Sequence, residues 1–325
     1  MAGPTPSVEA ILHAMIPYPY VDHTHADAVL VVGNAPGGER ALGELLGPRV
    51  LLIPYVMPGI RLARAVRDAT RGVDWAALDA VVLLGHGVVT FGGSARESYE
   101  RMVRLVSAVE ARLDEQGAFA AVRRGQATGD SRRTALSLAT LRRAVSEVAG
   151  RPLLARLDDS AEAVGLADRE DAADLATRGP LTPDHVIRTK RVPLLLGAEA
   201  SDGAVRAAVE AYASEYRAYF EAHDNGTLTC LDPAPRWAVW PGHGTVAFGE
   251  GVCATDIAHD VVLHSRRAFQ WAEAVGGWRA LPAADIFEVE YWELEQAKLT
   301  LAGTLPDLAG RVALVGLRIA RFDGL

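Results

Sequence analysis

The chain has 325 residues and a formal net charge of −8, a length that favours about two domains with full hydrophobic cores. Half of the residues are hydrophobic and 23% are charged, which excludes wholesale disorder. An acidic balance without a block of basic residues argues against non-specific binding to nucleic acids.

Lysine is nearly missing from the basic residues. Among 33 Lys and Arg residues, the lysines are Lys190 and Lys298. A codon bias toward arginine accounts for this ratio. The ratio still limits the possible mechanisms, because a Schiff-base lysine would have to be one of these two residues.

Cysteine usage and hydropathy indicate the compartment. Cys230 and Cys253 offer neither a disulfide scaffold nor a CxxC pair, which fits a reducing environment. The N-terminus lacks a basic segment followed by an apolar one. The most apolar stretch, residues 50–60, is interrupted by two prolines and is shorter than the roughly 20 residues that span a bilayer. We expect a soluble cytoplasmic protein with no membrane partner.

The first 116 residues alternate apolar runs with helical patterns, which predicts a layered α/β domain. A capping box of Ser94 and Glu97 precedes a long pattern of apolar residues at helical spacing. Helices are expected over 8–16 and 60–69, buried strands over 50–53, 78–84 and 88–91, and an apolar run covers 28–32.

A polar, arginine-rich stretch separates this part from the next. Residues 123–133 hold two glycines and few apolar side chains, so we expect a linker over 117–133. A second α/β region follows over 134–305. Its helical patterns cover 135–148, 204–221, 254–274 and 284–299, its strand candidates are 192–196 and 237–240, and Thr182-Pro183 predicts the start of a short helix.

One motif occurs twice. Residues 85–92 read GHGVVTFG and residues 242–249 read GHGTVAFG, each after an apolar strand and before a long helix. This similarity predicts a duplicated architecture in which the second region is a degenerate repeat; chance similarity of two glycine-rich turns is the alternative. His243 has no HxH pair or matched glutamate ahead of it, so we expect no second metal site there.

Three features could carry chemistry. His23 and His25 point to one side of an extended chain, where two imidazoles can share a metal ion. His86 stands between two glycines at the end of an apolar strand, and Glu9 precedes a helical run one turn before His13. Taken singly, each has an ordinary reading as a surface histidine or as a glutamate that favours a helix dipole.

Taken together, the same residues fit one site. Three histidines leave an open position on Zn²⁺, which is typical of a catalytic centre. A metal Lewis acid can polarise a carbonyl, and a nearby carboxylate can move a proton. Such a centre needs no Schiff-base lysine.

These motifs resemble the class II aldolase/adducin family. The family pattern places a Ser-x-Glu ahead of Leu-His, then an HxH, then an HG turn followed by a helix. This chain has SVEAILH at 7–13, HTH at 23–25, LGHG at 84–87 and YER at 99–101. The resemblance implies an α/β/α fold for residues 1–116.

Longer segments are similar to the aldolase and middle regions of bifunctional rhamnulose-1-phosphate aldolase/short-chain alcohol dehydrogenase proteins. The similar segments are VDHTHADAV at 21–29, IPYVMPG at 53–59, GHGVVTFGGSARESYERM at 85–102, LTPDHVIRTKRVPLLL at 181–196 and EVEYWELEQAKL at 288–299. The resemblance thus covers nearly the whole chain.

Residue by residue, the resemblance implies a role for each matching position. His23, His25 and His86 match the three metal ligands, Glu9 matches the acid/base that can also ligate the metal, and Ser7 matches a position that often contacts substrate phosphate. The implied cofactor is Zn²⁺. The implied reaction is reversible cleavage of a ketose 1-phosphate to dihydroxyacetone phosphate and an aldehyde. Family relatives build their sites at subunit interfaces, which implies a homo-oligomer.

Two departures from the pattern bear on activity. The family begins upstream with a Gly-Asn-x-Ser phosphate loop, whereas Ser7 stands almost at the start of this chain, so we expect an N-terminally truncated domain. Residues 310–315 (GRVALV) resemble the opening of a short-chain dehydrogenase, but no G-x-x-x-G-x-G follows. We interpret 306–325 as a remnant of such a domain and expect no NAD binding.

Two other functions stay open from the sequence. A non-catalytic, adducin-like protein or fragment is favoured by the missing phosphate loop and disfavoured by the retained ligands. A metal hydrolase that uses the HxH pair lacks the further Asp, Lys or His spacing that such enzymes need.

Overall fold

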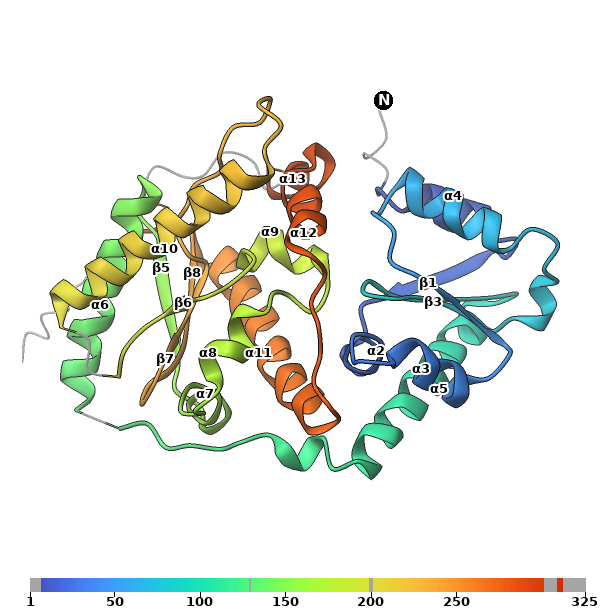
Figure 1. Cartoon of the computed structure of the whole chain (residues 1–325), viewed down its shortest axis with the longest axis horizontal. Helices are drawn as coiled ribbons and strands as arrows, with labels where there is room; N and C mark the ends of the chain where they lie inside the picture. The colour runs from blue at the N-terminus through green and yellow to red at the C-terminus, as the bar shows by residue number, and fades with distance from the viewer. Residues whose placement is uncertain (1–6, 129, 199–200, 301–308, 312–325) are drawn as a thin grey trace, which may run out of the picture.

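The computed structural model describes residues 7–128, 130–198, 201–300 and 309–311. Two four-stranded sheets organise the chain, and each lies between layers of helices (Figure 1). The fold is therefore of the α/β class that the alternating pattern predicts.

The first sheet has the strand order β1-β4-β3-β2. β4 lies antiparallel to both β1 and β3, whereas β2 lies parallel to β3. The strands are β1 (Tyr20–Thr24), β2 (Val50–Ile53), β3 (Ala80–Leu83) and β4 (Gly87–Gly92).

The second sheet repeats this arrangement in the order β5-β8-β7-β6, with the same antiparallel and parallel pairs. Its strands are β5 (Leu154–Asp158), β6 (Leu194–Leu195), β7 (Trp237–Trp240) and β8 (Gly244–Gly249). The repeated GHG motif connects β3 to β4 in one sheet and β7 to β8 in the other.

The helices of the first region surround its sheet. α4 packs on β2 and on α1, while α2 and α3 pack against α5, which covers β4 (Figure 1). The helices are α1 (Ala10–Met15), α2 (Asp27–Gly33), α3 (Gly38–Leu46), α4 (Ile60–Ala69) and α5 (Ala95–Glu115), with short 3₁₀ turns η1 (Trp75–Ala77) and η2 (Phe119–Ala121).

The second region places α6 and α10 on the outer face of its sheet and α7, α8 and α11 on the inner face (Figure 1). Its helices are α6 (Ser131–Ala149), α7 (Ala161–Ala167), α8 (Ala172–Thr177), η3 (Pro183–His185), α9 (Val186–Thr189), α10 (Asp202–His223), α11 (Val252–Ala274), α12 (Ala283–Glu290) and α13 (Glu293–Thr300).

Packing between the inner helical layers joins the two regions. α11 contacts α2, and one hydrophobic cluster runs from Val31 and Val82 of the first region to Trp237 and Phe269 of the second. Alternate residues of β3 face opposite clusters, as the period of two requires: Val82 lies in the shared core and Val81 in the outer one.

Several elements form where the sequence predicts them. β2 and α4 have the expected bounds. At the start of α5, Ser94 Oγ accepts a hydrogen bond from Glu97 N at 3.2 Å, and Glu97 accepts one from Gly93 N at 2.8 Å. The Ser94 cap is therefore confirmed, whereas the reciprocal bond of Glu97 goes to the residue before the N-cap rather than to Ser94 itself.

Two segments add to or differ from the expected elements. The apolar run at 28–32, for which no element was expected, forms most of helix α2, and its residues from Ala28 to Val32 are all buried. The segment 284–299, expected as one helix, forms the two helices α12 and α13. The chain breaks there because Tyr291 hydrogen-bonds Tyr216 while Trp292 packs on Gly59 of the first region.

The expected linker differs in extent from the structure. α6 begins at Ser131, inside the stretch expected as linker, and Asp130 caps it through the backbone N–H groups of Arg132 and Arg133. The interpretation of 306–325 as a dehydrogenase remnant falls outside the described residues, apart from residues 309–311.

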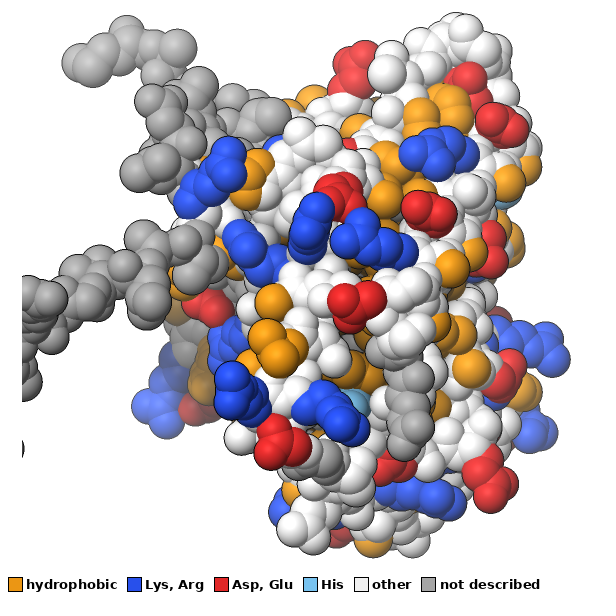
Figure 2. Space-filling model, turned by 90° about the vertical axis from the view of Figure 1, so that its left-hand side faces the viewer, with side chains coloured by type: hydrophobic (Ala, Val, Ile, Leu, Met, Phe, Trp, Pro, Cys, Tyr) orange, Lys and Arg blue, Asp and Glu red, His pale blue; other side chains and the backbone are white. Residues whose placement is uncertain are grey.

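The surface carries both signs of charge. Figure 2 shows basic and acidic side chains interspersed over one end of the molecule, without a continuous patch of one sign among the coloured residues. Within the described chain, no helix combines the length and apolar character required to cross a bilayer.

Candidate metal centre

Four side chains predicted to hold a metal converge in the first region. Glu9 immediately precedes α1, His23 lies on β1, His25 follows β1, and His86 occupies the turn between β3 and β4. One ligand atom from each lies within 4.8 Å of the others. Residues separated by up to 77 positions in the sequence are thus brought to one point.

The donor atoms approach closely. His23 Nε2 lies 3.0 Å from His25 Nε2, and Glu9 Oε1 lies 3.2 Å from both His23 Nε2 and His86 Nε2. The carboxylate oxygen therefore sits between two imidazoles. Nitrogen lone pairs that point toward one another and toward a carboxylate form a pocket suited to a cation.

Backbone pairing sets the orientation of His23. His23 stands opposite Val89 of β4 in the sheet, and its Nδ1 donates a hydrogen bond to the Val88 carbonyl at 3.0 Å. When Nδ1 carries the proton, Nε2 keeps its lone pair for a cation. The neighbouring carbonyl of β4 thus selects the useful tautomer.

Gly87 provides the space in which the histidines meet. A Cβ at this position would lie 2.5 Å from the Thr24 carbonyl oxygen, 2.8 Å from His25 and 2.9 Å from His23. The preceding Gly85 has φ of +70°, a left-handed conformation that glycine adopts without strain. The GHG motif is therefore a steric requirement of this site.

Burial and mutual charge shift the titration of these groups. Burial by itself raises the pKa of Glu9, but hydrogen bonds and charge from His23 and His86 outweigh it and hold that pKa well below its usual range. Burial lowers the pKa of His23, yet Glu9 raises it above the ordinary value. His25, with burial as the main cause, has its pKa lowered to about 4.

The residues present fit a divalent cation. His86 is 1% exposed, and neither ring nitrogen has a hydrogen-bond partner among the described residues. Leaving a buried polar atom unpaired costs about 1–3 kcal/mol, and a cation bound to one of these nitrogens would offset that cost. Three imidazoles and a carboxylate suit Zn²⁺ and similar transition metals. The His25 side chain keeps 26% of its surface exposed, which leaves a route for a ligand.

Ser7 lies beside this cluster. Its Oγ accepts a hydrogen bond from Glu9 N at 3.2 Å, and its side chain is exposed. The hydroxyl hydrogen stays available for an anionic group. Ser7 thus also supports the turn that carries Glu9 into the site.

A carboxylate of the second region, which the sequence motifs do not predict, also approaches the cluster. Asp184 Oδ2, on η3, lies 3.7 Å from His86 Nε2 and 4.0 Å from His25 Nε2. Lys298 on α13 approaches the same carboxylate, and it pairs with buried Glu295. Asp184 directly follows Thr182-Pro183, which the sequence predicts as a helix start, and no residue spacing around it is typical of a metal site.

Thr182 occupies the N-cap position of η3, and Pro183 begins the short helix that this dipeptide predicts. No capping hydrogen bond forms at the start of η3. The hydroxyl instead donates to the His86 carbonyl at 3.3 Å. This hydrogen bond fastens the second region to the turn that bears a candidate ligand.

The corresponding position in the second sheet lacks the donors. His243 takes the place of His86, but strand register aligns Leu157 with His23, since Val246 and Val89 are their respective partners. Asp159 then corresponds to His25. The His243 ring packs on Trp240, with centroids 4.0 Å apart.

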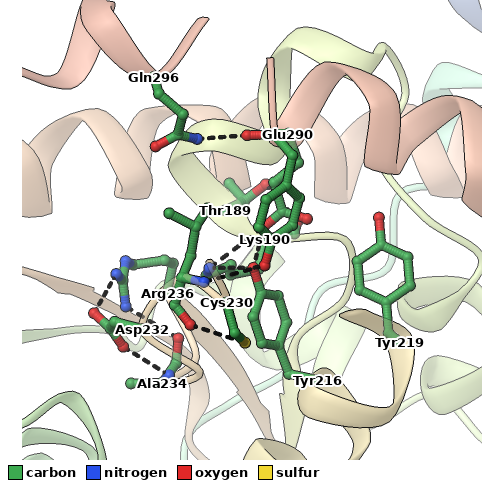
Figure 3. A network of polar contacts seen from close by, with 12 residues as sticks. Thr189, Lys190, Tyr216, Tyr219, Cys230, Asp232, Ala234, Arg236, Glu290 and Gln296 are labelled. Atoms are coloured by element: carbon green, nitrogen blue, oxygen red, sulfur yellow. Dashed lines mark hydrogen bonds and ion pairs between the residues drawn. The ribbon is translucent and has the colours of Figure 1, made fainter. Parts of the chain in front are cut away.

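Lys190 belongs to a separate buried network (Figure 3). Its Nζ donates to Tyr216 OH at 2.8 Å and lies 3.3 Å from Glu290 Oε1, while Tyr216 donates to the same glutamate oxygen at 2.7 Å. Burial lowers the pKa of Lys190. With 6% exposure, this amine is enclosed by its partners, which is the environment of a structural ion pair.

Comparison with known proteins covers both regions. The family described as "Class II Aldolase and Adducin N-terminal domain" matches residues 1–113, and that described as "Aldolase class II, second domain" matches residues 132–299.

Two individual proteins are also similar. The uncharacterized oxidoreductase YuxG of Bacillus subtilis (strain 168) is 30% identical over 96% of this chain and 47% of its own length, so the chain spans about half of that relative. A solved structure of the N-terminal class II aldolase domain of a conserved protein from Thermoplasma acidophilum is 37% identical over 34% of this chain and 49% of that chain, with a TM-score of 0.31. Because the second-domain match alone spans more than half of the chain, and the N-terminal-domain match covers most of the rest, this chain belongs to the class II aldolase and adducin family.

Proposed function

We propose that this chain is a metal-dependent aldolase that cleaves a ketose 1-phosphate, such as rhamnulose 1-phosphate, to dihydroxyacetone phosphate and an aldehyde. The observation that supports it is the convergence of three histidine nitrogens and a carboxylate within 4.8 Å. His23, His25, His86 and Glu9 would hold the divalent cation, with Zn²⁺ as the first candidate.

The reaction breaks the C3–C4 bond of the ketose. The C4 hydroxyl gives up its proton and becomes the aldehyde carbonyl, while C3 keeps the bonding electron pair and gains a proton. A bound cation would supply a Lewis acid that withdraws electron density from the C2 carbonyl as negative charge develops there. With rhamnulose 1-phosphate, the aldehyde is L-lactaldehyde.

Glu9 is the residue proposed to move the proton. A carboxylate at this position can accept the proton of the C4 hydroxyl and later return a proton to C3. Its Oε1 contacts two of the histidines, which fixes the carboxylate at the site. Ser7 is proposed to donate its hydroxyl hydrogen to the substrate phosphate.

A direct test combines metal analysis with a retro-aldol assay. Purified protein is loaded with Zn²⁺, Co²⁺ or Mn²⁺, dialysed, and supplied with rhamnulose 1-phosphate, and dihydroxyacetone phosphate is measured through a coupled dehydrogenase. The proposal expects product that depends on the metal and is lost in a His23→Ala, His25→Ala variant. Absence of bound metal in the loaded protein would contradict it.

The assay also separates the proposal from a non-catalytic role. Metal binding without cleavage of any ketose 1-phosphate tested would favour the adducin-like alternative. A matched control is His243→Ala, which changes the second GHG turn and should leave both metal content and turnover unchanged.

A further inference from the structure

Asp184 brings a carboxylate of the second region to the histidine cluster of the first. One oxygen, Oδ2, lies 3.7 Å from His86 Nε2 and 4.0 Å from His25 Nε2. This oxygen is buried and has no hydrogen-bond partner among the described residues. A buried carboxylate oxygen without a donor is costly, so its place beside two candidate ligand nitrogens calls for a cation.

The segment that carries Asp184 is anchored on both sides. Thr182 donates a hydrogen bond to the His86 carbonyl at 3.3 Å, and Asn34 Nδ2 donates to the Leu181 carbonyl at 2.8 Å. Leu181 and Thr182 are each 1% exposed. The approach of Asp184 to the histidines is therefore fixed by contacts between the regions.

The second oxygen of Asp184 faces a lysine. Lys298 Nζ lies 3.9 Å from Asp184 Oδ1 and 2.5 Å from Glu295 Oε1. Glu295 is 1% exposed, so the ammonium group of Lys298 lies against a buried carboxylate of the same helix, α13. The two oxygens of Asp184 thus face opposite partners, a lysine on one side and histidines on the other.

The donor groups of this assembly suit a divalent cation. Glu9, Asp184 and Glu295 bring three carboxyl groups to it, and Lys298 contacts two of them. Carboxyl groups together with imidazoles are a donor set that divalent transition metals accept.

The choice of lysine at this position is informative. The chain uses arginine almost everywhere, yet both of its lysines make close contacts with a buried glutamate. An ammonium group is a compact point charge, whereas a guanidinium is a broad planar fork. Lys298 therefore fits beside Glu295 while still facing Asp184.

We propose that Asp184 is a further donor to the cation and that Lys298 is its positioning residue, so that both regions build the metal centre. This inference rests on the proposed metal-dependent function. It adds that the first region by itself holds an incomplete site.

Cobalt binding to the whole chain tests the inference without an activity assay. Metal-free wild type and Asp184→Asn are titrated with Co²⁺, and affinity and visible absorption are recorded. We expect Asp184→Asn to bind Co²⁺ roughly 10- to 100-fold more weakly, with altered absorption bands. Asp260→Asn, which neutralises an exposed aspartate of α11, should match wild type.

Additional variants separate ligation from folding. Asp184→Glu keeps the charge but displaces the carboxylate, so its absorption should change even if Asp184→Asn fails to fold. Lys298→Met removes the group that faces Asp184 Oδ1, so its Co²⁺ absorption bands should shift, and Lys298→Arg, which places a cationic group there again, should reverse part of that shift. Circular dichroism verifies that each variant is folded.

The outcomes are distinguishable. Wild-type protein that binds no Co²⁺ would overturn the proposed metal centre together with this inference. Wild-type binding, with identical affinity and spectrum in folded Asp184→Asn and Asp184→Glu, would overturn the inference alone. An unchanged Lys298→Met variant would remove the positioning role.

Discussion

The two GHG turns occupy equivalent places in sheets of the same strand order, but their surroundings differ. In the first sheet, the strand beside the turn supplies His23 opposite Val89; in the second, Leu157 stands opposite Val246. The turn and its glycines are common to both. The comparison teaches that the neighbouring strand, rather than the GHG turn itself, determines whether a cation site can form.

The largest expected effect comes from exchanging the histidine of each turn. His86→Ala removes a donor that is 1% exposed and without a hydrogen-bond partner in the described chain, so metal content after dialysis should fall to near zero and aldol cleavage should be lost. His243→Ala should retain both. Mass-spectrometric metal analysis checks the pair, and equal metal loss in the two variants would remove the distinction between the turns.

Substitution of the carboxylate gives the next effect. Glu9→Gln preserves shape but removes the group proposed to move the proton, so kcat should fall about 10²- to 10⁴-fold. Asp159→Asn changes an acidic residue at the place that corresponds to His25 in the second sheet, and should leave kcat unaltered. Steady-state kinetics with saturating metal provides the measurement; a Glu9→Gln enzyme with wild-type kcat would assign proton transfer elsewhere.

Removal of the buried lysine should instead affect folding. Lys190→Met leaves Glu290 buried without its cationic partner, which should lower the free energy of unfolding by about 3–5 kcal/mol. Arg206→Met, which breaks a solvent-exposed pair with Glu147, should leave the free energy of unfolding nearly unchanged. Urea unfolding compares the two. A similar cost for both would mean that the network in Figure 3 contributes little.

The smallest effect concerns pH. Glu9 raises the pKa of His23 above its usual value, so a proton competes with the cation below that pKa. The affinity of the protein for Co²⁺ should therefore increase by up to about tenfold per pH unit, and it should level off once His23 is neutral. His25, with a pKa of about 4, adds no slope near neutrality. Co²⁺ titrations between about pH 6 and pH 8 provide the data.

A variant sharpens the pH test. Glu9→Gln removes the charge that raises the pKa of His23, and burial then lowers that pKa. The Co²⁺ affinity of Glu9→Gln should consequently change less with pH near neutrality than that of the wild type. A wild-type slope in Glu9→Gln would mean that another group holds the competing proton.

Local patterns predicted much of the fold. β2 and α4 follow from short apolar and amphipathic patterns, and α5 from its capping box. β5 escaped prediction because residues 154–158 (LARLD) carry charged side chains and none is fully buried. The run from Ala28 to Val32 in α2 shows no helical period, since all five residues are apolar and buried.

The site could be predicted only in part. Glu9, His23, His25 and His86 stand in short motifs, and each motif has a local reason for its spacing. Asp184 and Lys298 lie in later elements, and docking of the second region brings them to the cluster. Such tertiary contacts leave no periodic or spacing signal in a single sequence.

The most direct test of the central claim is to locate the cation. A crystal of the whole chain grown with Co²⁺ is measured at the cobalt absorption edge, and anomalous difference density is calculated. The account predicts a peak bounded by Glu9, His23, His25 and His86, with Asp184 facing it from the second region. A fully loaded crystal with its cobalt peak beside His243, or with no peak at the four-residue cluster, would contradict it.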